Sequence, residues 1–259
     1  MNLELQGKTA LVTGSTAGIG LAIAQSLANE GVRVIVNGRT QERVDAALAK
    51  LPAGAVGLAA DLGTAAGAAA AIERFPTVDI LINNMGIFEP KAFENITDAD
   101  WFRFFEINVM SGVRLSRHYL PRMKEAGWGR IIFISSESGI QTPAEMIHYG
   151  MTKTAQLAVS RGLAETTAGT GVTVNAVLPG PTASEGVEGF VSNLAKHKGT
   201  SREAVEQDFF RTARPTSLLQ RFATSEEVAA MVTFVASPLS AATNGAALRV
   251  DGGVVRSIV

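Results

Sequence analysis

The chain has 259 residues, of which 46% are hydrophobic and 18% charged, and this is enough to bury one large core. Its 23 basic and 24 acidic residues give a net charge of −1, which does not suggest nucleic acid or an anionic membrane surface as a partner. The absence of cysteine excludes disulfides, thiolate metal sites and cysteine nucleophiles, and the three histidines are too scattered in the sequence to suggest a metal site.

The first residues, MNLELQGKTALVTG, lack a basic leader followed by an apolar run and a small-residue cleavage site. We therefore expect folded protein from the start of the sequence and a cytoplasmic location. The stretch 54–75 is apolar, but it is built from alanine and glycine with Asp61 inside it. It predicts a strand, a turn and a short helix, and no membrane span.

Short β-rich runs recur along the chain with helical stretches between them. Most are nearly continuous Val, Ile, Leu and Ala, a pattern typical of strands that are covered on both faces of a parallel sheet. The seven predicted strands are residues 8–13, 32–37, 55–60, 78–83, 130–135, 172–177 and 247–250.

The segments between these runs predict helices. Residues 19–30 follow a glycine-rich turn, residues 41–50 follow Thr40 as N-cap, and a long segment begins after Thr97. Further helices are predicted over 148–168 and from Ser225 onward. This alternation predicts a Rossmann-type doubly wound α/β fold, formed by residues 1–259 as a single domain.

Residues 183–222 break the alternation with two short amphipathic helices, beyond the carboxyl end of the sixth predicted strand. An insertion of this length at that place predicts a lid over a substrate. Its side chains Phe190, Phe209 and Phe210 would exclude water from the site, or would only pack the lid helices against each other.

The segment LVTGSTAGIG (11–20) places Gly14, Gly18 and Gly20 where the first strand turns into the first helix. Glycines there would let a pyrophosphate approach the backbone N–H groups at the helix N-terminus. The spacing is not that of the common dinucleotide fingerprint, and a tight turn alone would also explain the glycines. The position after the first strand favours nucleotide binding.

The end of the second predicted strand bears on the choice of cofactor. Enzymes specific for NAD usually carry an acidic residue near this point, to accept hydrogen bonds from the ribose hydroxyls. Here Gly38 and Arg39 occupy the position, and the next acidic residue is Glu42. A guanidinium can pair with a 2′-phosphate, so Arg39 favours NADP, with NAD as the alternative; an ordinary solvated arginine would look the same in the sequence.

Five motifs stand in one order along the chain: TGSTAGIG (13–20), NNMG (83–86), Asn108–Val109, YGMTK (149–153) and PGPT (179–182). With these motifs the sequence resembles the short-chain dehydrogenase/reductase family over almost its whole length. The resemblance implies cofactor-binding residues at the ends of successive strands. They are Gly14, Ser15, Thr16, Gly18, Ile19 and Gly20 at the phosphates, Asp61 and Leu62 beside the adenine, Asn83 and Gly86 on the ribose side, and Pro179, Gly180 and Thr182 at the nicotinamide carboxamide.

The resemblance also implies a catalytic set of Asn108, Ser136, Tyr149 and Lys153, with Tyr149 and Lys153 contacting the cofactor as well. Residues four apart on a helix share a face, so Lys153 lies beneath Tyr149. An ammonium there should lower the tyrosine pKa from its usual value of about 10. By the resemblance, Ser136 would position the substrate oxygen and Asn108 would hold a water that relays protons from Lys153.

Substrate specificity is expected from residues near this set and from the lid. The candidates are Ile87, Phe88, Glu137, Ser138 and Glu145. Glu137 and Glu145 would face a polar or cationic substrate, or would be surface residues or structural hydrogen-bond acceptors.

The leading function is NADPH-dependent reduction of a small-molecule ketone, or oxidation of the corresponding secondary alcohol. The alternatives are a 3-oxoacyl reductase acting on a carrier-protein or CoA thioester, and a non-catalytic nucleotide sensor on the same fold. The resemblance further implies a homotetramer, or else a dimer, formed through segments 98–125 and 148–168. No metal is expected.

Overall fold

The computed structural model describes residues 1–258. Within them, the side chains of five residues of one helix lie outside the description: Glu188, Phe190, Asn193, Leu194 and Lys198. The aromatic role expected for Phe190 therefore concerns a side chain outside the described part.

One seven-stranded parallel sheet forms the centre of the molecule, with strand order β3-β2-β1-β4-β5-β6-β9. All seven predicted strands are confirmed: β1 Thr9–Val12, β2 Arg33–Gly38, β3 Val56–Ala59, β4 Ile80–Asn83, β5 Gly129–Ile134, β6 Val172–Pro179 and β9 Ala247–Val250. The order reverses direction between β1 and β4. In open α/β sheets, ligands bind at the carboxyl ends of the strands beside such a reversal.

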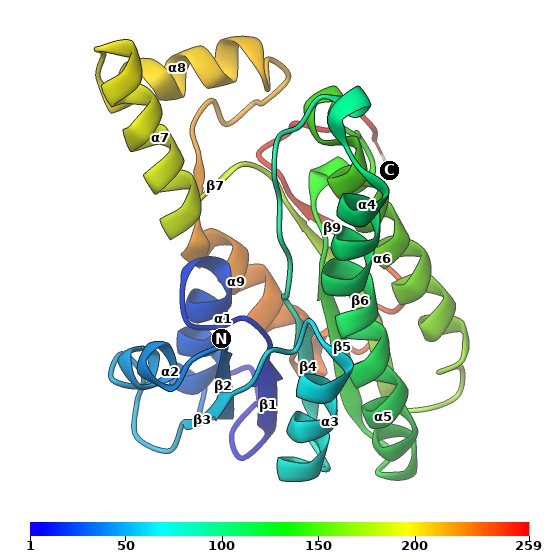
Figure 1. Cartoon of the computed structure of the whole chain (residues 1–259). Coiled ribbons are helices and arrows are strands. Elements are labelled where there is room, and N and C mark those ends of the chain that lie inside the picture. The colour runs from blue at the N-terminus through cyan, green and yellow to red at the C-terminus, as the bar shows by residue number, and fades with distance from the viewer. Residues whose placement is uncertain (259) are drawn as a thin grey trace.

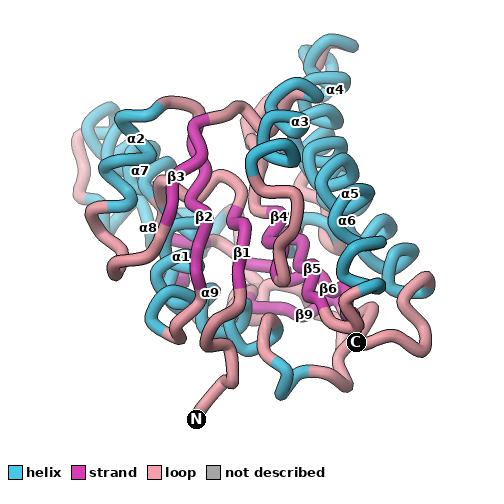
Figure 2. Tube along the Cα trace, turned by 90° about the horizontal axis from the view of Figure 1, so that it is seen from below, coloured by secondary structure: helices cyan, strands magenta, loops and turns pink. Residues whose placement is uncertain are grey.

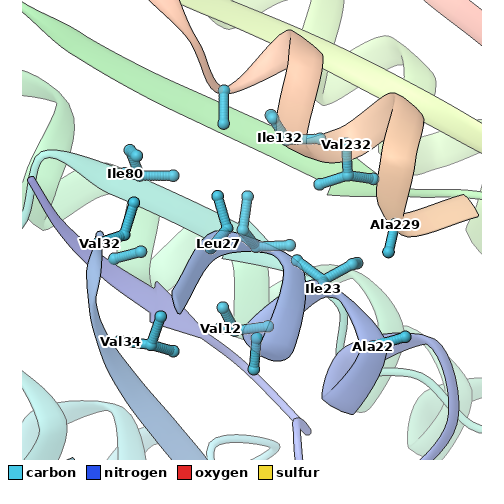
Figure 3. Packing of buried hydrophobic residues seen from close by; sticks show 14 of the residues in the cluster. Val12, Ala22, Ile23, Leu27, Val32, Val34, Ile80, Ile132, Ala229 and Val232 are labelled. Carbon is cyan, nitrogen blue, oxygen red and sulfur yellow. The ribbon is translucent and has the colours of Figure 1, made fainter. Parts of the chain in front are cut away.

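Helices cover both faces of this sheet, as Figure 2 shows. On one face, α1 (Gly18–Asn29), α2 (Gln41–Leu48) and α9 (Ser225–Val235) pack on alternate strand residues such as Val12 and Ile132, part of which Figure 3 shows in detail. On the other face, α3 (Ala65–Arg74), α5 (Ser111–Glu125) and α6 (Ile147–Glu165) cover the residues between, including Leu11 and Phe133. Burial on both faces explains why the strand sequences are continuously apolar.

Threonine N-caps begin several of these helices where the sequence predicts them. Thr40 accepts a hydrogen bond from the Arg43 backbone at the start of α2, and Thr97 forms a capping box with Asp100 at the start of α4 (Asp98–Phe105). The long helix predicted after Thr97 is not continuous. A π-helical segment, Glu106–Met110, separates α4 from α5. Single π-helical turns often mark functional sites.

The predicted lid consists of α7 (Glu185–Lys198) and α8 (Arg202–Thr212), which Figure 1 shows as a pair set apart from α5 and α6. A small parallel sheet closes the insertion at its base, where β7 (Thr182–Ala183) pairs with β8 (Ala223–Thr224). These two strands were not predicted, because two residues are too few to show a β pattern. None of the helices in the described chain is both long enough and apolar enough for a membrane span.

Candidate active site

The turn between β1 and α1 has the form expected of a pyrophosphate cradle. Gly14 and Gly18 have φ angles of +60° and +52°, in the left-handed region that favours glycine. A Cβ on Gly20 would lie 2.5 Å from the Asn84 amide nitrogen and 2.5 Å from the Gly14 carbonyl oxygen. Any side chain at position 20 would therefore clash with the turn, so glycine is required there. The backbone N–H groups at the N-terminus of α1 are the groups that would bind an anion.

Two asparagines fix the shape of this turn. The Gly14 N–H donates to Asn37 Oδ1 at 3.0 Å, and Asn84 Nδ2 donates to the carbonyl oxygens of Thr13 and Gly14 at 3.0 and 3.1 Å. Neither asparagine was among the predicted cofactor residues. The second asparagine of the NNMG motif was the available signal for Asn84, which also lines the cavity described below.

The other residues predicted at the phosphate and adenosine end occupy different environments. The buried Ser15 hydroxyl donates to the Val12 carbonyl and accepts from the Asn37 N–H, so it shapes the turn. Thr16 packs where a side chain on Gly38 would otherwise stand, and Arg39 is exposed directly after β2. An exposed guanidinium at this edge is free to meet a phosphate from solvent.

Three further predicted cofactor residues differ in how exposed their side chains are. Asp61 is exposed after β3, whereas the Leu62 side chain is completely buried in the core, so only its backbone is available to an adenine. Asn83 Nδ2 donates to the Ser116 hydroxyl on α5 at 3.2 Å, so its side chain lies within the core between β4 and α5. Asn84 is the asparagine whose side chain bonds to the glycine turn.

A cavity of about 560 Å³ adjoins the glycine turn and lies between the sheet and the lid. The lid contributes apolar residues to its wall, among them Val191, Val205 and Phe209. Predicted site residues in the lining are Ile19, Gly86, Ile87, Phe88, Ser136, Glu137, Ser138, Glu145, Tyr149, Lys153, Pro179, Gly180 and Thr182. Most of the predicted site is thus brought together around one space.

Ser136, Tyr149 and Lys153 meet at the sheet side of this cavity. Ser136 follows β5 by two residues, and it lines the cavity together with Tyr149 of α6. Lys153 Nζ donates to the Ile134 carbonyl at 2.9 Å and lies 5.5 Å from the centroid of the Tyr149 ring. The neighbouring Ser135 also lines the cavity, but its hydroxyl donates to the Lys153 carbonyl at 2.9 Å.

The environment changes both pKa values on this helix face. Burial raises the pKa of Tyr149 above its ordinary value, while the hydrogen bond with Ser136 acts in the opposite direction. The expected lowering of the tyrosine pKa is therefore wrong in this structure, because the loss of hydration outweighs nearby positive charge. Burial also lowers the pKa of Lys153, to about 7, since it disfavours the ammonium; Glu137 acts against that effect.

Asn108 lies in the π-helical segment, where it connects several parts of the site. Its Oδ1 accepts from the Ile87 N–H at 2.8 Å, and its Nδ2 donates to the Ile87 carbonyl and to the Thr152 hydroxyl. The Asn108 backbone carbonyl accepts from Gln156 Nε2 at 2.6 Å, and Gln156 Oε1 accepts from Lys153 Nζ at 3.2 Å. Gln156, which was not predicted, thus connects the lysine to the backbone of Asn108.

The two glutamates expected near the substrate share an arginine from the lid. The Glu137 side chain is 6% exposed, and its Oε1 accepts from Arg214 Nε at 3.1 Å. Arg214 Nη1 donates to Glu145 Oε1 at 3.0 Å, and the Glu145 side chain is half exposed. Glu137 Oε2 accepts a hydrogen bond from the Ser136 hydroxyl. Arg214 was not predicted, because no sequence spacing links it to Glu137, which lies 77 positions earlier in the chain.

Comparisons with known proteins agree with this arrangement. A model of the short chain dehydrogenase family matches residues 8–195. The chain is 54% identical to the uncharacterized oxidoreductase YvaG of Bacillus subtilis (strain 168), with 100% of both chains covered. It is 35% identical to the D-beta-hydroxybutyrate dehydrogenase of Cupriavidus necator, over 97% of this chain and 99% of that protein.

Among solved structures, L-sorbose reductase from Gluconobacter frateurii, complexed with NADPH and L-sorbose, has a TM-score of 0.93 and 29% sequence identity, with 100% of both chains covered. The fold, the matched family and the full-length relatives agree with one another. The chain belongs to the short-chain dehydrogenase/reductase family of oxidoreductases.

Proposed function

We propose that this protein is an NADPH-dependent reductase of small-molecule ketones. The observation that carries the proposal is the meeting of Ser136, Tyr149 and Lys153 in a cavity that adjoins the glycine turn. The fit to a dinucleotide is supported by the glycine turn at the N-terminus of α1, with Gly14 in the left-handed region, and by the exposed Arg39 directly after β2. The bound cofactor would supply the hydride.

The residues of the chain supply the proton and the alignment. As hydride reaches a carbonyl carbon, charge develops on the oxygen, and a donor positioned there stabilises it. Tyr149 suits this task in the reductive direction because burial raises its pKa and keeps the hydroxyl protonated. Ser136 lines the same cavity, where its hydroxyl can hold the same oxygen in place.

The preference for NADPH rests on Arg39 and on the absence of an acid at the end of β2. The same dinucleotide is named in the complex of the sorbose reductase described above. A cellular reductase commonly draws on NADPH, so cofactor and direction support one another in this proposal.

The test compares NADPH and NADH oxidation over ketones, aldehydes and 3-oxoacyl thioesters, with Tyr149→Phe beside the wild-type protein. We expect turnover with NADPH, and a loss of at least about 100-fold in kcat for the phenylalanine variant with cofactor binding retained. Near-normal turnover in that variant would show that another group donates the proton. Faster turnover of the thioesters than of free ketones would favour the 3-oxoacyl alternative.

Arg39→Leu tests the cofactor assignment separately. Loss of a charge-assisted contact to the 2′-phosphate should raise the KM for NADPH by about tenfold and leave the KM for NADH unchanged. Arg43→Leu is the matched control, because Arg43 is also exposed near this edge but pairs with Glu185. If Arg39→Leu changes both KM values equally, Arg39 does not read the phosphate.

A further inference from the structure

A buried carboxylate accepts the hydrogen bond that the proposed reaction needs at the substrate oxygen. Ser136 donates its hydroxyl hydrogen to Glu137 Oε2, while the Ser138 N–H donates to the serine oxygen at 3.1 Å. Under the proposed function, on which this inference rests, Ser136 must instead donate to the carbonyl oxygen of the substrate. A hydroxyl has a single hydrogen, so it cannot donate to both acceptors at once.

When Ser136 donates to the substrate instead, Glu137 loses one of its hydrogen-bond donors. Its Oε1 keeps the bond from Arg214, but Oε2 then loses its donor at a side chain that is only 6% exposed. A buried charged acceptor without a partner is costly. A substrate that carries its own hydrogen-bond donor beside the carbonyl would remove that cost.

The geometry sets the position of this donor. Glu137 Oε2 and the substrate oxygen are alternative acceptors for the same Ser136 hydrogen, so each lies within one hydrogen-bond length of the serine oxygen. A hydroxyl on the carbon next to the carbonyl is close enough to reach Oε2 while the carbonyl oxygen faces Ser136 and Tyr149. A donor several carbons away would lie too far from the carbonyl oxygen to bond to Oε2 at the same time.

The charges around Glu137 exclude some donors. Arg214 is already paired with Glu137 and Glu145, so it offers no free positive charge to a carboxylate substrate. An ammonium that donates to Glu137 would stand beside the Arg214 guanidinium, and the two like charges would repel each other. A neutral hydroxyl meets neither difficulty.

We propose that the substrate is a neutral ketone with a hydroxyl on the carbon next to the carbonyl, and that this hydroxyl donates to Glu137 Oε2. Glu137 is then a specificity-determining residue, and Arg214 holds its carboxylate in place from the lid. On reduction, the substrate becomes a vicinal diol: the hydride goes to the carbonyl carbon and the proton of Tyr149 to its oxygen.

Matched substrates test this in the wild-type protein. Hydroxyacetone, methoxyacetone and butanone are methyl ketones that carry a hydroxyl, a methoxy or a methyl group on the carbon next to the carbonyl. A second series of ketones carries the same three substituents on a longer chain. The methoxy compound keeps the electron-withdrawing oxygen but cannot donate. We expect kcat/KM for the hydroxyketones to exceed both analogues by at least about tenfold, and acetoacetate to be poorer still.

Glu137→Gln removes the charge at nearly constant size, and it should lower kcat/KM for the hydroxyketone far more than for the methoxyketone. Glu89→Gln is the matched control, since that carboxylate belongs to the loop beside Phe88 but pairs with Arg103. It should leave the preference as it is. Thermal unfolding and NADPH titration of both variants show whether the fold and cofactor site are intact.

The failures can be told apart. Equal kcat/KM for the three analogues, or a hydroxyl preference that survives in Glu137→Gln, would overturn the inference while reduction of ketones still stands. If the protein binds NADPH but reduces no carbonyl compound of any series, the proposed function fails and takes this inference with it.

Discussion

Lys153 is held in place by hydrogen bonds to two other parts of the chain. Its ammonium donates to the Ile134 carbonyl and to Gln156 Oε1, and Gln156 in turn donates to the Asn108 backbone. The π-helical segment brings the Asn108 carbonyl to this position while its side chain binds Ile87. Gln156 therefore joins Lys153 to the π-helical turn, and the Asn108 side chain joins that turn to the loop after β4.

Gln156 should help to keep Lys153 charged, and this can be measured. Burial lowers the pKa of Lys153 to about 7, so activity that needs the ammonium declines as the pH rises through that value. Gln156→Leu removes an acceptor of the charged form, so the decline should begin about one pH unit lower. Gln156→Glu supplies a carboxylate and should move the decline upward. The measurement is kcat/KM between pH 5.5 and 9.5 in all three proteins. Identical profiles would show that Gln156 serves only packing.

The residues of this site differ in how well the sequence predicts them. Ser136, Tyr149 and Lys153 follow a fixed spacing along one strand and one helix, and the structure brings them together. Arg214 and Glu137 meet only because the lid folds back over β5, and no local pattern records a contact of that kind. Asn83 and Asn84 are adjacent in sequence, and only the pleat of β4 decides which one faces the core.

At the scale of elements, burial pattern and capping carry most of the information. The strands are predicted because both of their faces are buried, and helix starts are predicted by Thr40 and Thr97. The π-helical segment is missed because a shift from i,i+4 to i,i+5 bonding leaves no mark in composition. It matters, since it carries Asn108, whose side chain bonds to Ile87 and to Thr152 on α6.

His148 lies where α4 packs against the start of α6. The ring is fully buried, its centroid is 4.0 Å from that of Phe104, and neither ring nitrogen has a hydrogen-bond partner among the described residues. Burial lowers the pKa of His148, although Asp100 and Glu89 act in the opposite direction. A neutral ring without partners in this interface costs stability.

His148→Leu should therefore stabilise the protein at pH 7.5, by about 1 kcal/mol or more. The wild-type protein should also lose stability as the pH falls below about 6.5, because the unfolded histidine binds a proton that the folded one resists. The leucine variant should lack that part of the acid slope. Thermal unfolding from pH 5 to 8 measures both effects. A leucine variant that is less stable at pH 7.5 would indicate that the ring nitrogens do have partners.

For the whole molecule, the sheet and its two helical layers leave an apolar surface near α4. Phe102 and Phe105 on that helix are 74% and 40% exposed, although Phe104 between them is completely buried. Large apolar side chains grouped on one surface commonly mark a contact with another protein. The segment belongs to residues 98–125, where the sequence predicts an interface between subunits.

We expect a homotetramer in solution, in which Phe102 and Phe105 are covered by a second copy of the chain. Light scattering after size exclusion at micromolar concentration should give four times the 27.1 kDa of one chain. Phe102→Ser with Phe105→Ser should reduce the mass to that of a dimer or monomer, because two exposed rings lose the burial that association provides. Circular dichroism and NADPH titration show whether the separated subunits remain folded. A wild-type protein that stays monomeric would rule out this interface, and an unchanged tetramer in the double variant would place it elsewhere on the surface.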